Sequence, residues 1–305
     1  MKTKILIFAL SLTCYFSFAQ QDAQFTQYMY NTININPAYA GSRGAMSIFG
    51  LYRTQWVGLD GAPTTGAFSM NTPINNSRLG FGLSVVTDEI GPTSDQTISG
   101  DLSYTIPFAD EVKLSFGIKG SLNLFNFDRN KLNIAPEGQT DVALNNITNE
   151  LSPNIGAGIY LHSDKYYLGA SVPNFLEDRK YSDNSVSVFK ERMTSYFIGG
   201  YVFDLSPNLM FKPAFLTKLV TGAPVQLDLS GNFLLYEKLT LGVAYRWDAA
   251  VSALAGFQVT DGLFVGYGYD RETTNLRNYN SGSHEIFLRF ELFNRVKKLV
   301  SPRFF

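Results

Sequence analysis

Two histidines, His162 and His284, are the residues of this sequence best suited to proton transfer near neutral pH. A hydrolytic site would place one of them beside a serine nucleophile or an acid. Neither histidine lies in a nucleophile motif, and the strand pattern described next puts them at opposite ends of their sheet. They cannot share one site, so we expect no catalytic residue and no enzymatic activity.

Metal and cofactor chemistry have equally little support. The only cysteine, Cys14, lies in a leader that we expect to be removed. Its removal would exclude thiolate catalysis and cysteine-ligated metals. The sequence contains neither a phosphate-binding loop nor the spacing of a cation-binding loop. We therefore expect no metal ion and no other cofactor.

Charged side chains recur on the polar faces of segments in which polar and apolar residues alternate. The candidates for an inward-facing charged set are Asp101, Asp228, Lys113, Lys119, Arg246 and Arg289. Paired charges that fill a narrow interior are the simpler interpretation. A polar channel or a ligand track is the alternative.

This alternation is the main structural signal. From Val112 to Leu124, even-numbered residues are apolar or glycine, and odd-numbered residues are polar or glycine. A period of two is that of a β-strand. The stretch is longer than the roughly 9 to 11 residues with which a tilted strand crosses a bilayer. The same pattern recurs at 97–106, 225–235, 239–248 and 285–292.

We predict about fourteen antiparallel strands, with twelve or sixteen as alternatives. They lie near residues 43–53, 62–73, 78–87, 97–106, 111–125, 151–161, 165–173, 191–203, 208–219, 224–235, 238–248, 250–259, 262–270 and 283–293. Short turns alternate with connections that include the long ones at 126–150, 173–190 and 271–282. This arrangement is typical of an all-β transmembrane barrel in the outer membrane, with both termini in the periplasm.

A soluble β-sandwich would also alternate. Its strands are usually about 5 to 6 residues long, whereas many of these segments have ten residues or more. The 25 Phe and 17 Tyr residues, with only 17% charged residues, suit a wall that faces outer-membrane lipid. Because 25 basic residues are balanced by 26 acidic ones, we expect no nucleic acid as a partner.

The chain starts with a signal-peptide pattern. Lys2 and Lys4 precede an apolar run, and Ser17-Phe18-Ala19 is a small-x-small cleavage site. The run is shorter than the roughly 20 residues of a spanning helix. We predict a cleaved signal peptide at 1–19, an N-terminal plug or leader segment at 20–42, and a barrel at 43–305 with a short C-terminal periplasmic tail.

Residues 22–41 are rich in aromatic and amide side chains and carry no charge after Asp22. We expect this segment to pack inside the barrel as a plug; a periplasmic handle and a passive leader are the alternatives. Pro37 keeps Asn36 out of the helical region, and Gly41 permits a turn. We expect Asn36–Gly41 to form one unit with Gln55 and Trp56, in which Gln55 or a leader amide accepts the indole N–H.

Several short blocks also carry a family resemblance. They are Gln24–Met29, Asn36–Gly41, Arg53–Gly58 with Gly61–Thr64, Asp88–Pro92 and the ending Ser301–Phe304. Their order and spacing resemble the PorP/SprF membrane proteins of type IX secretion, and within that family the SprF-like members. The family motif and structural-partner positions are Asn36, Pro37, Ala38, Tyr39, Gly41, Arg53, Gln55, Trp56, Gly61, Pro63, Asp88 and Gly91.

The resemblance implies a non-enzymatic outer-membrane component of the type IX secretion system. Such proteins bind, anchor or assist the export of large surface adhesins with a type B C-terminal sorting domain, in gliding motility and adhesion. The implied partners are an adhesin of this kind and other components of the machinery. Fourteen strands enclose far less space than a folded adhesin needs. A transporter or porin for a small or hydrophobic solute is the alternative.

Overall fold

Antiparallel strands form most of the structure, a computed structural model that describes residues 28–74, 77–132, 146–176, 179–180, 189–190 and 192–292. The strands are β1 (Met46–Thr54), β2 (Thr64–Pro73), β3 (Leu79–Ile90), β4 (Thr93–Ala109), β5 (Val112–Phe127), β6 (Ile147–His162), β7 (Tyr166–Val172), β8 (Arg179–Lys180), β9 (Phe189–Lys190), β10 (Thr194–Tyr201), β11 (Phe203–Ser206), β12 (Leu209–Val220), β13 (Gln226–Leu235), β14 (Leu239–Arg246), β15 (Ala250–Gln258), β16 (Leu263–Glu272) and β17 (Ser283–Leu292).

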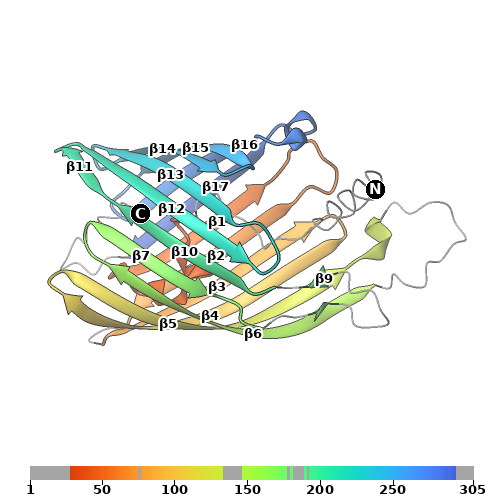
Figure 1. Ribbon diagram of the computed structural model, residues 1–305, viewed down its shortest axis with the longest axis horizontal. Coiled ribbons are helices and arrows are strands. Elements are labelled where there is room, and N and C mark those ends of the chain that lie inside the picture. The colour runs from red at the N-terminus through yellow and green to blue at the C-terminus, as the bar shows by residue number, and fades with distance from the viewer. Residues whose placement is uncertain are drawn as a thin grey trace, which may run out of the picture.

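Fifteen of these strands make one sheet that closes on itself. Most strands of this sheet pair with the strands before and after them in the chain, whereas β7 pairs with β10, β10 pairs with β12, and β1 pairs with β17. β10 and β11 pair with successive parts of β12 and together count as one strand of the wall. The barrel is therefore fourteen-stranded, as the alternation predicted. The strands wind obliquely around the barrel (Figure 1). The separate pair β8 and β9 lies in the connection between β7 and β10.

The two faces of the wall have opposite chemistry. On β5, Phe116 and Ile118 point outward and are exposed, whereas Ser115 and Lys119 are buried inside. The predicted faces of this strand are therefore confirmed. None of the helices among the described residues has the length and apolar character of a membrane-spanning helix.

The two ends of the barrel differ in their connections. At one end, named here the short-turn end, the links after β2, β4, β6, β11, β13 and β15 have two to five residues. β1 starts and β17 stops at this end. The other end, named here the long-loop end, carries the links 55–63 and 273–282, at the right of Figure 1. The assignment of the short-turn end to the periplasm stays a prediction.

Several predicted strand limits were wrong. β3 and β4 run on to Ile90 and from Thr93, so only Gly91 and Pro92 join them, and Asp88 lies inside a strand. The predicted strand 191–203 is interrupted at Val202, which is buried and donates its N–H to Lys165 O (2.7 Å). Alternation alone does not mark where a strand leaves the membrane, because polar residues there suit either face.

The outward face generates a test of how deep each residue of β5 lies in the bilayer. Ile118 is 61% exposed near the middle of β5, and Leu114 faces the same way near the short-turn end. We expect Ile118→Arg to lower the free energy of unfolding by about 2–4 kcal/mol and Leu114→Arg by only about 0–1 kcal/mol, since the cost of an arginine on the lipid face peaks at the bilayer midplane. Denaturant titration of the barrel in lipid vesicles measures both. Equal losses would refute the proposed depth.

Candidate functional site

A short segment of the chain lies inside the barrel before β1 begins. It is named here the luminal segment, residues 28–41, and contains α2 (Thr32–Ile35) and η2 (Pro37–Tyr39). Asn36 joins the two helices in an extended conformation (φ −137°, ψ 107°), and its side chain accepts a hydrogen bond from Ala38 N (3.0 Å). This is the conformation expected of a residue before proline.

The wall beneath the luminal segment is lined by glycine. A Cβ atom on Gly117 would lie 2.2 Å from Ala38 N, and one on Gly80 would lie 2.1 Å from Ala40 O. A Cβ on Gly158 would lie 2.3 Å from Asn36 Oδ1. The backbone of the segment therefore lies directly on β3 and β5, and the Asn36 side chain lies directly on β6, at distances that only glycine permits.

The wall also supplies hydrogen bonds to the backbone of the luminal segment. Ser171 donates to Ile35 O (2.7 Å), Ser103 to Ala40 O (2.7 Å) and Lys119 to Ile33 O (3.3 Å). Asn36 Nδ2 in turn donates to Ile159 O (3.0 Å). Buried carbonyl groups need such partners. The segment is thus bound to the wall by specific polar contacts as well as by packing.

Aromatic rings contact the segment from both sides of the lumen. Tyr30 stacks on Phe264 (centroids 5.3 Å apart) and contacts Phe287 (4.6 Å), both from the far wall. Tyr39 meets Tyr160 edge to face (5.5 Å). Tyr28 and Met29 are also buried. The segment therefore spans the lumen from β5 and β6 across to β16 and β17.

Gly41 ends the luminal segment with the turn that the sequence predicted. Its φ is +71°, and a Cβ there would lie 2.9 Å from Gly80 Cα. The chain leaves the segment at the short-turn end, where Arg43 forms an ion pair with Glu291. From there β1 returns toward the long-loop end. The predicted boundary of the N-terminal region at residue 42 and the signal peptide remain predictions, since residues 1–27 lie outside the described part of the chain.

Five of the six predicted inward-facing charges are at least partly buried. Lys119 pairs with Asp101 (3.1 Å), and Arg246 pairs with Asp228 through Nε (3.0 and 3.2 Å). Arg289 lies 5.2 Å from the ring centre of Phe264 and 3.6 Å from Glu291 Oε1. Lys113 has the same strand parity as Lys119 but is exposed at the short-turn end.

Three of the family blocks meet at the long-loop end. Gln55 N donates to Pro63 O (2.9 Å), which closes the loop after β1, and Gly91 N donates to Gly61 O (3.0 Å), which ties this loop to the β3–β4 turn. Gly61 and Gly91 have φ values of +73° and +54°. Asp88 accepts a hydrogen bond from Thr65 on the neighbouring strand. The blocks around residues 53–58, 61–64 and 88–92 thus form one rim.

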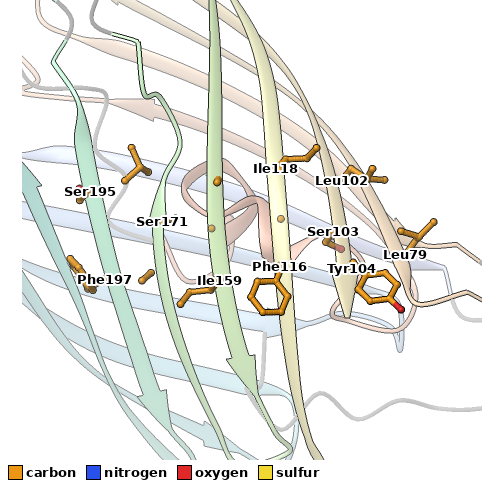
Figure 2. A pocket seen from close by; sticks show the side chains of 15 residues that line it. Leu79, Leu102, Ser103, Tyr104, Phe116, Ile118, Ile159, Ser171, Ser195 and Phe197 are labelled. Carbon is orange, nitrogen blue, oxygen red and sulfur yellow. The ribbon is translucent and has the colours of Figure 1, made fainter. Parts of the chain in front are cut away.

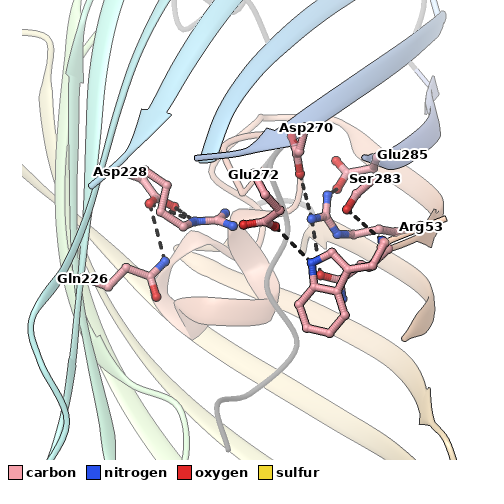
Figure 3. Close-up of polar contacts among 10 residues, drawn as sticks. Arg53, Gln226, Asp228, Asp270, Glu272, Ser283 and Glu285 are labelled. Carbon is pink, nitrogen blue, oxygen red and sulfur yellow. Dashed lines mark hydrogen bonds and ion pairs between the residues drawn. The ribbon is translucent and has the colours of Figure 1, made fainter. Parts of the chain in front are cut away.

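Arg53 is the centre of a buried charge cluster below this rim. It contacts Asp270 Oδ2 (2.7 Å) and Glu285 Oε2 (3.1 Å), and all three side chains are at most 2% exposed. Figure 3 shows these contacts together with Asp228 and Gln226 on the other side of the lumen. Removing the arginine would leave two carboxylates buried, which usually costs about 3–5 kcal/mol. The cluster fixes β1, β16 and β17 to one another.

Trp56 links the rim to the last long loop. Its φ is +45°, its indole N–H donates to Glu272 Oε1 (3.0 Å), and its backbone N–H donates to Ser283 Oγ (3.2 Å). Val57 and Gly282 add a backbone hydrogen bond (2.9 Å). The indole N–H thus bonds to Glu272 rather than to Gln55 or an amide of residues 28–41, so that expectation was wrong.

The prediction that Asn36–Gly41 forms one unit with Gln55 and Trp56 was also wrong. The first group contacts the glycine-lined wall and ends at the short-turn end, whereas Gln55 and Trp56 lie at the long-loop end. The nine residues of β1 separate them along the barrel. The family positions thus form two clusters, one inside the lumen and one on the rim.

Asp270, Glu272 and Glu285 were not singled out as site residues from the sequence. The stretch 270–272 resembles a solvated surface because its three residues are charged, yet β16 runs through it and turns Asp270 inward. Phe264, Gly266 and Gly268 are even-numbered and face inward, and this parity is the sequence signal that could have identified Asp270 and Glu272 as inward-facing. It extends the inward face to 270 and 272.

The described residues do not bring the two histidines together in one hydrolytic site. His162 is buried at the short-turn end of β6, whereas His284 contacts Tyr267 at the long-loop end of β17. No group of three or more His, Cys, Asp or Glu residues in the described part of the chain could hold a metal ion. The arrangement instead suits a closed barrel with a rigid rim.

The glycine-lined wall generates a second test. Gly117→Ala should lower the free energy of unfolding by about 1–3 kcal/mol, because overpacking of this size strains a well-packed core. It should also speed amide hydrogen exchange in residues 33–40. Gly120→Ala is the matched control, since this glycine lies on the same strand with no atom within 4 Å of its Cβ position. Similar exchange in both variants would refute the close contact.

Comparisons with solved structures give distant likenesses. The outer membrane protein Omp33 of Acinetobacter baumannii has a TM-score of 0.48 and 9% identity, over 81% of this chain and 98% of that one. A deletion mutant of the monoaromatic hydrocarbon channel TodX has 0.49 and 9%, over 88% and 94%. The toluene transporter TbuX of Ralstonia pickettii has 0.49 and 8%, over 84% and 91%. No curated protein matches the chain.

A family model gives the decisive comparison. The model for the type IX secretion system membrane protein PorP/SprF matches residues 17–290, which include both the luminal segment and the rim. The strand topology is that of an outer-membrane barrel. The chain belongs to the PorP/SprF family and is an outer-membrane component of type IX secretion.

Proposed function

We propose that this barrel binds a large secreted adhesin at its long-loop end and holds it at the cell surface, while its own lumen stays closed. The observation that carries the proposal is the position of the luminal segment. It spans the lumen from the glycine-lined wall to Phe264, which its residue Tyr30 contacts. A barrel filled in this way suits docking better than passage of a polypeptide.

The rim supports docking at the long-loop end. Hydrogen bonds join the loop after β1 to the β3–β4 turn and to the loop before β17. The buried Arg53 cluster holds the strands beneath them. A surface fixed before binding loses less conformational entropy when a partner docks. The type B sorting domain of the adhesin is the partner that the family resemblance implies.

Membership in the family also supports other components of the type IX machinery as partners. In this proposal the long-loop end faces the outside, and the short-turn end, where β1 begins and β17 ends, faces the periplasm. The adhesin and the machinery would then contact opposite ends of one barrel. No catalytic step is assigned to either end.

An exposed aromatic residue at each end allows a matched test. Tyr279, in the loop before β17, is 70% exposed, and Tyr236, in the turn after β13, is 69% exposed. Tyrosine is enriched among residues that dominate binding energy. We expect Tyr279→Ala to weaken binding of a purified type B sorting domain at least tenfold, about 1.4 kcal/mol, and Tyr236→Ala to leave it unchanged.

The measurement is the affinity of the full-length barrel in lipid nanodiscs for the isolated sorting domain. Binding that is equal in both variants, or weaker only in Tyr236→Ala, would contradict docking at the long-loop end. No binding, combined with uptake of a small solute by vesicles that contain the wild-type barrel, would favour the transporter alternative.

A further inference from the structure

A shallow depression lies on the outer surface of the wall, directly behind the part of the luminal segment around Asn36–Ala38. Its volume is about 640 Å³, and its lining comes from β3 to β7 and β10. Figure 2 shows the depression from outside, with Phe116, Ile159 and Phe197 along its lower side in the view and the ribbon of the luminal segment behind the strands. This volume is within the roughly 300–1,000 Å³ typical of small-molecule sites.

Two outward-facing alanines create the hollow. Ala170 lies between Ile159 and Phe197 in the cross-strand row, and Ala157 lies between Ile118 and Val172. Each methyl group is thus flanked by larger apolar side chains on both neighbouring strands. The small alanine side chains leave the surface lower than the larger side chains on either side. The choice of residues therefore produces the concave shape.

The wall is also thin at this place. Gly117 and Gly158 contribute to the lining, and on their inner side the luminal segment approaches so closely that a Cβ would clash. Ser103 and Ser171, the other inward residues of the lining, bond to Ala40 O and Ile35 O inside the barrel. The hollow is therefore closed from the lumen.

The hollow is continuous with the lipid-facing surface. Leu102, Phe116, Ile118 and Ile159 are exposed side chains of spanning strands, and their neighbours along each strand face the same way. It lies in the half of the wall toward the short-turn end, since Leu79 begins β3 and Ile159 lies three residues before the end of β6. Hydrocarbon covers such a surface, so its occupant must be apolar and available in the bilayer.

We propose that one acyl chain of a phospholipid from the leaflet at the short-turn end occupies this depression as a bound ligand. A flexible chain can follow the dip at Ala157 and Ala170 and recover the dispersion contacts that an empty hollow would lose. A partner helix, about 10–12 Å across with its side chains, would fit only a short piece of itself into about 640 Å³. The proposal does not depend on adhesin docking.

Photo-crosslinking tests the site in the full-length wild-type barrel. Nanodiscs would contain phosphatidylethanolamine with a diazirine near the end of one acyl chain, and mass spectrometry would map the labelled residues. We expect labelling at Phe116, Ile118, Ile159 and Phe197 to exceed labelling at Val243, Tyr245 and Tyr267 of the opposite wall at least fivefold. Equal labelling of the two walls would mean ordinary boundary lipid and overturn the proposal.

Paired variants add a second measurement. Ala157→Phe with Ala170→Phe fills the hollow and should cut labelling of its rim at least fivefold. Ala253→Phe with Ala255→Phe is the control, because these alanines face outward on β15, across the barrel. Circular dichroism checks that both variants fold; if the filled variant does not, the wild-type map alone decides. Unchanged rim labelling in a folded filled variant, or displacement of the lipid by a co-purified protein, would overturn the assignment.

Discussion

Close contact between the luminal segment and a glycine-lined wall is the constraint on which the rest of the structure depends. The backbone at Pro37–Ala40 touches Gly80 and Gly117, and the Asn36 side chain touches Gly158, at distances that leave no room for a Cβ atom. A strand normally gains stability from its side chains, and glycine in its interior weakens it. Here the lost packing is replaced by the segment itself, so barrel and segment stabilise one another.

The interior charges follow from this filling. Lys119 contacts Asp101 and also donates to Ile33 O, so one pair serves both the wall and the segment. Nearer the long-loop end, Arg53 of β1 contacts Asp270 of β16 and Glu285 of β17. In a site that water reaches poorly, each charge needs a nearby opposite charge. The luminal segment thus occupies the lumen toward the short-turn end, and the Arg53 ion pairs lie beneath the rim at the long-loop end.

The sequence predicted the wall well because alternation is a local property. The faces of β5, the number of strands and the inward position of Asp101 and Lys119 all depend on residues that are neighbours along a strand or in a hairpin. The bends at Asn36-Pro37 and Gly41 were also predictable, since they depend on the backbone limits of single residues. The inward glycines of β3, β5 and β6 were visible in the sequence, but their partner could be identified only in three dimensions.

The failed predictions for Trp56 concern contacts between segments that are far apart in the sequence. Trp56 meets Glu272 because barrel closure sets β1 beside β17, and the loop before β17 brings this end of β16 within reach. Nothing in the sequence near Trp56 encodes that approach. The charged run Asp270-Arg271-Glu272 resembled exposed surface for a related reason: its buried partner, Arg53, lies more than two hundred residues away in the chain.

The central claim is that the luminal segment closes the barrel, and single-channel recording in planar bilayers tests it most directly. The account predicts no stable conductance for the wild-type protein and stable open levels for a variant lacking residues Gln20–Ala40 whose strand content, measured by circular dichroism, is retained. Equal conductance of the two proteins, or silence of the folded deletion variant, would contradict it.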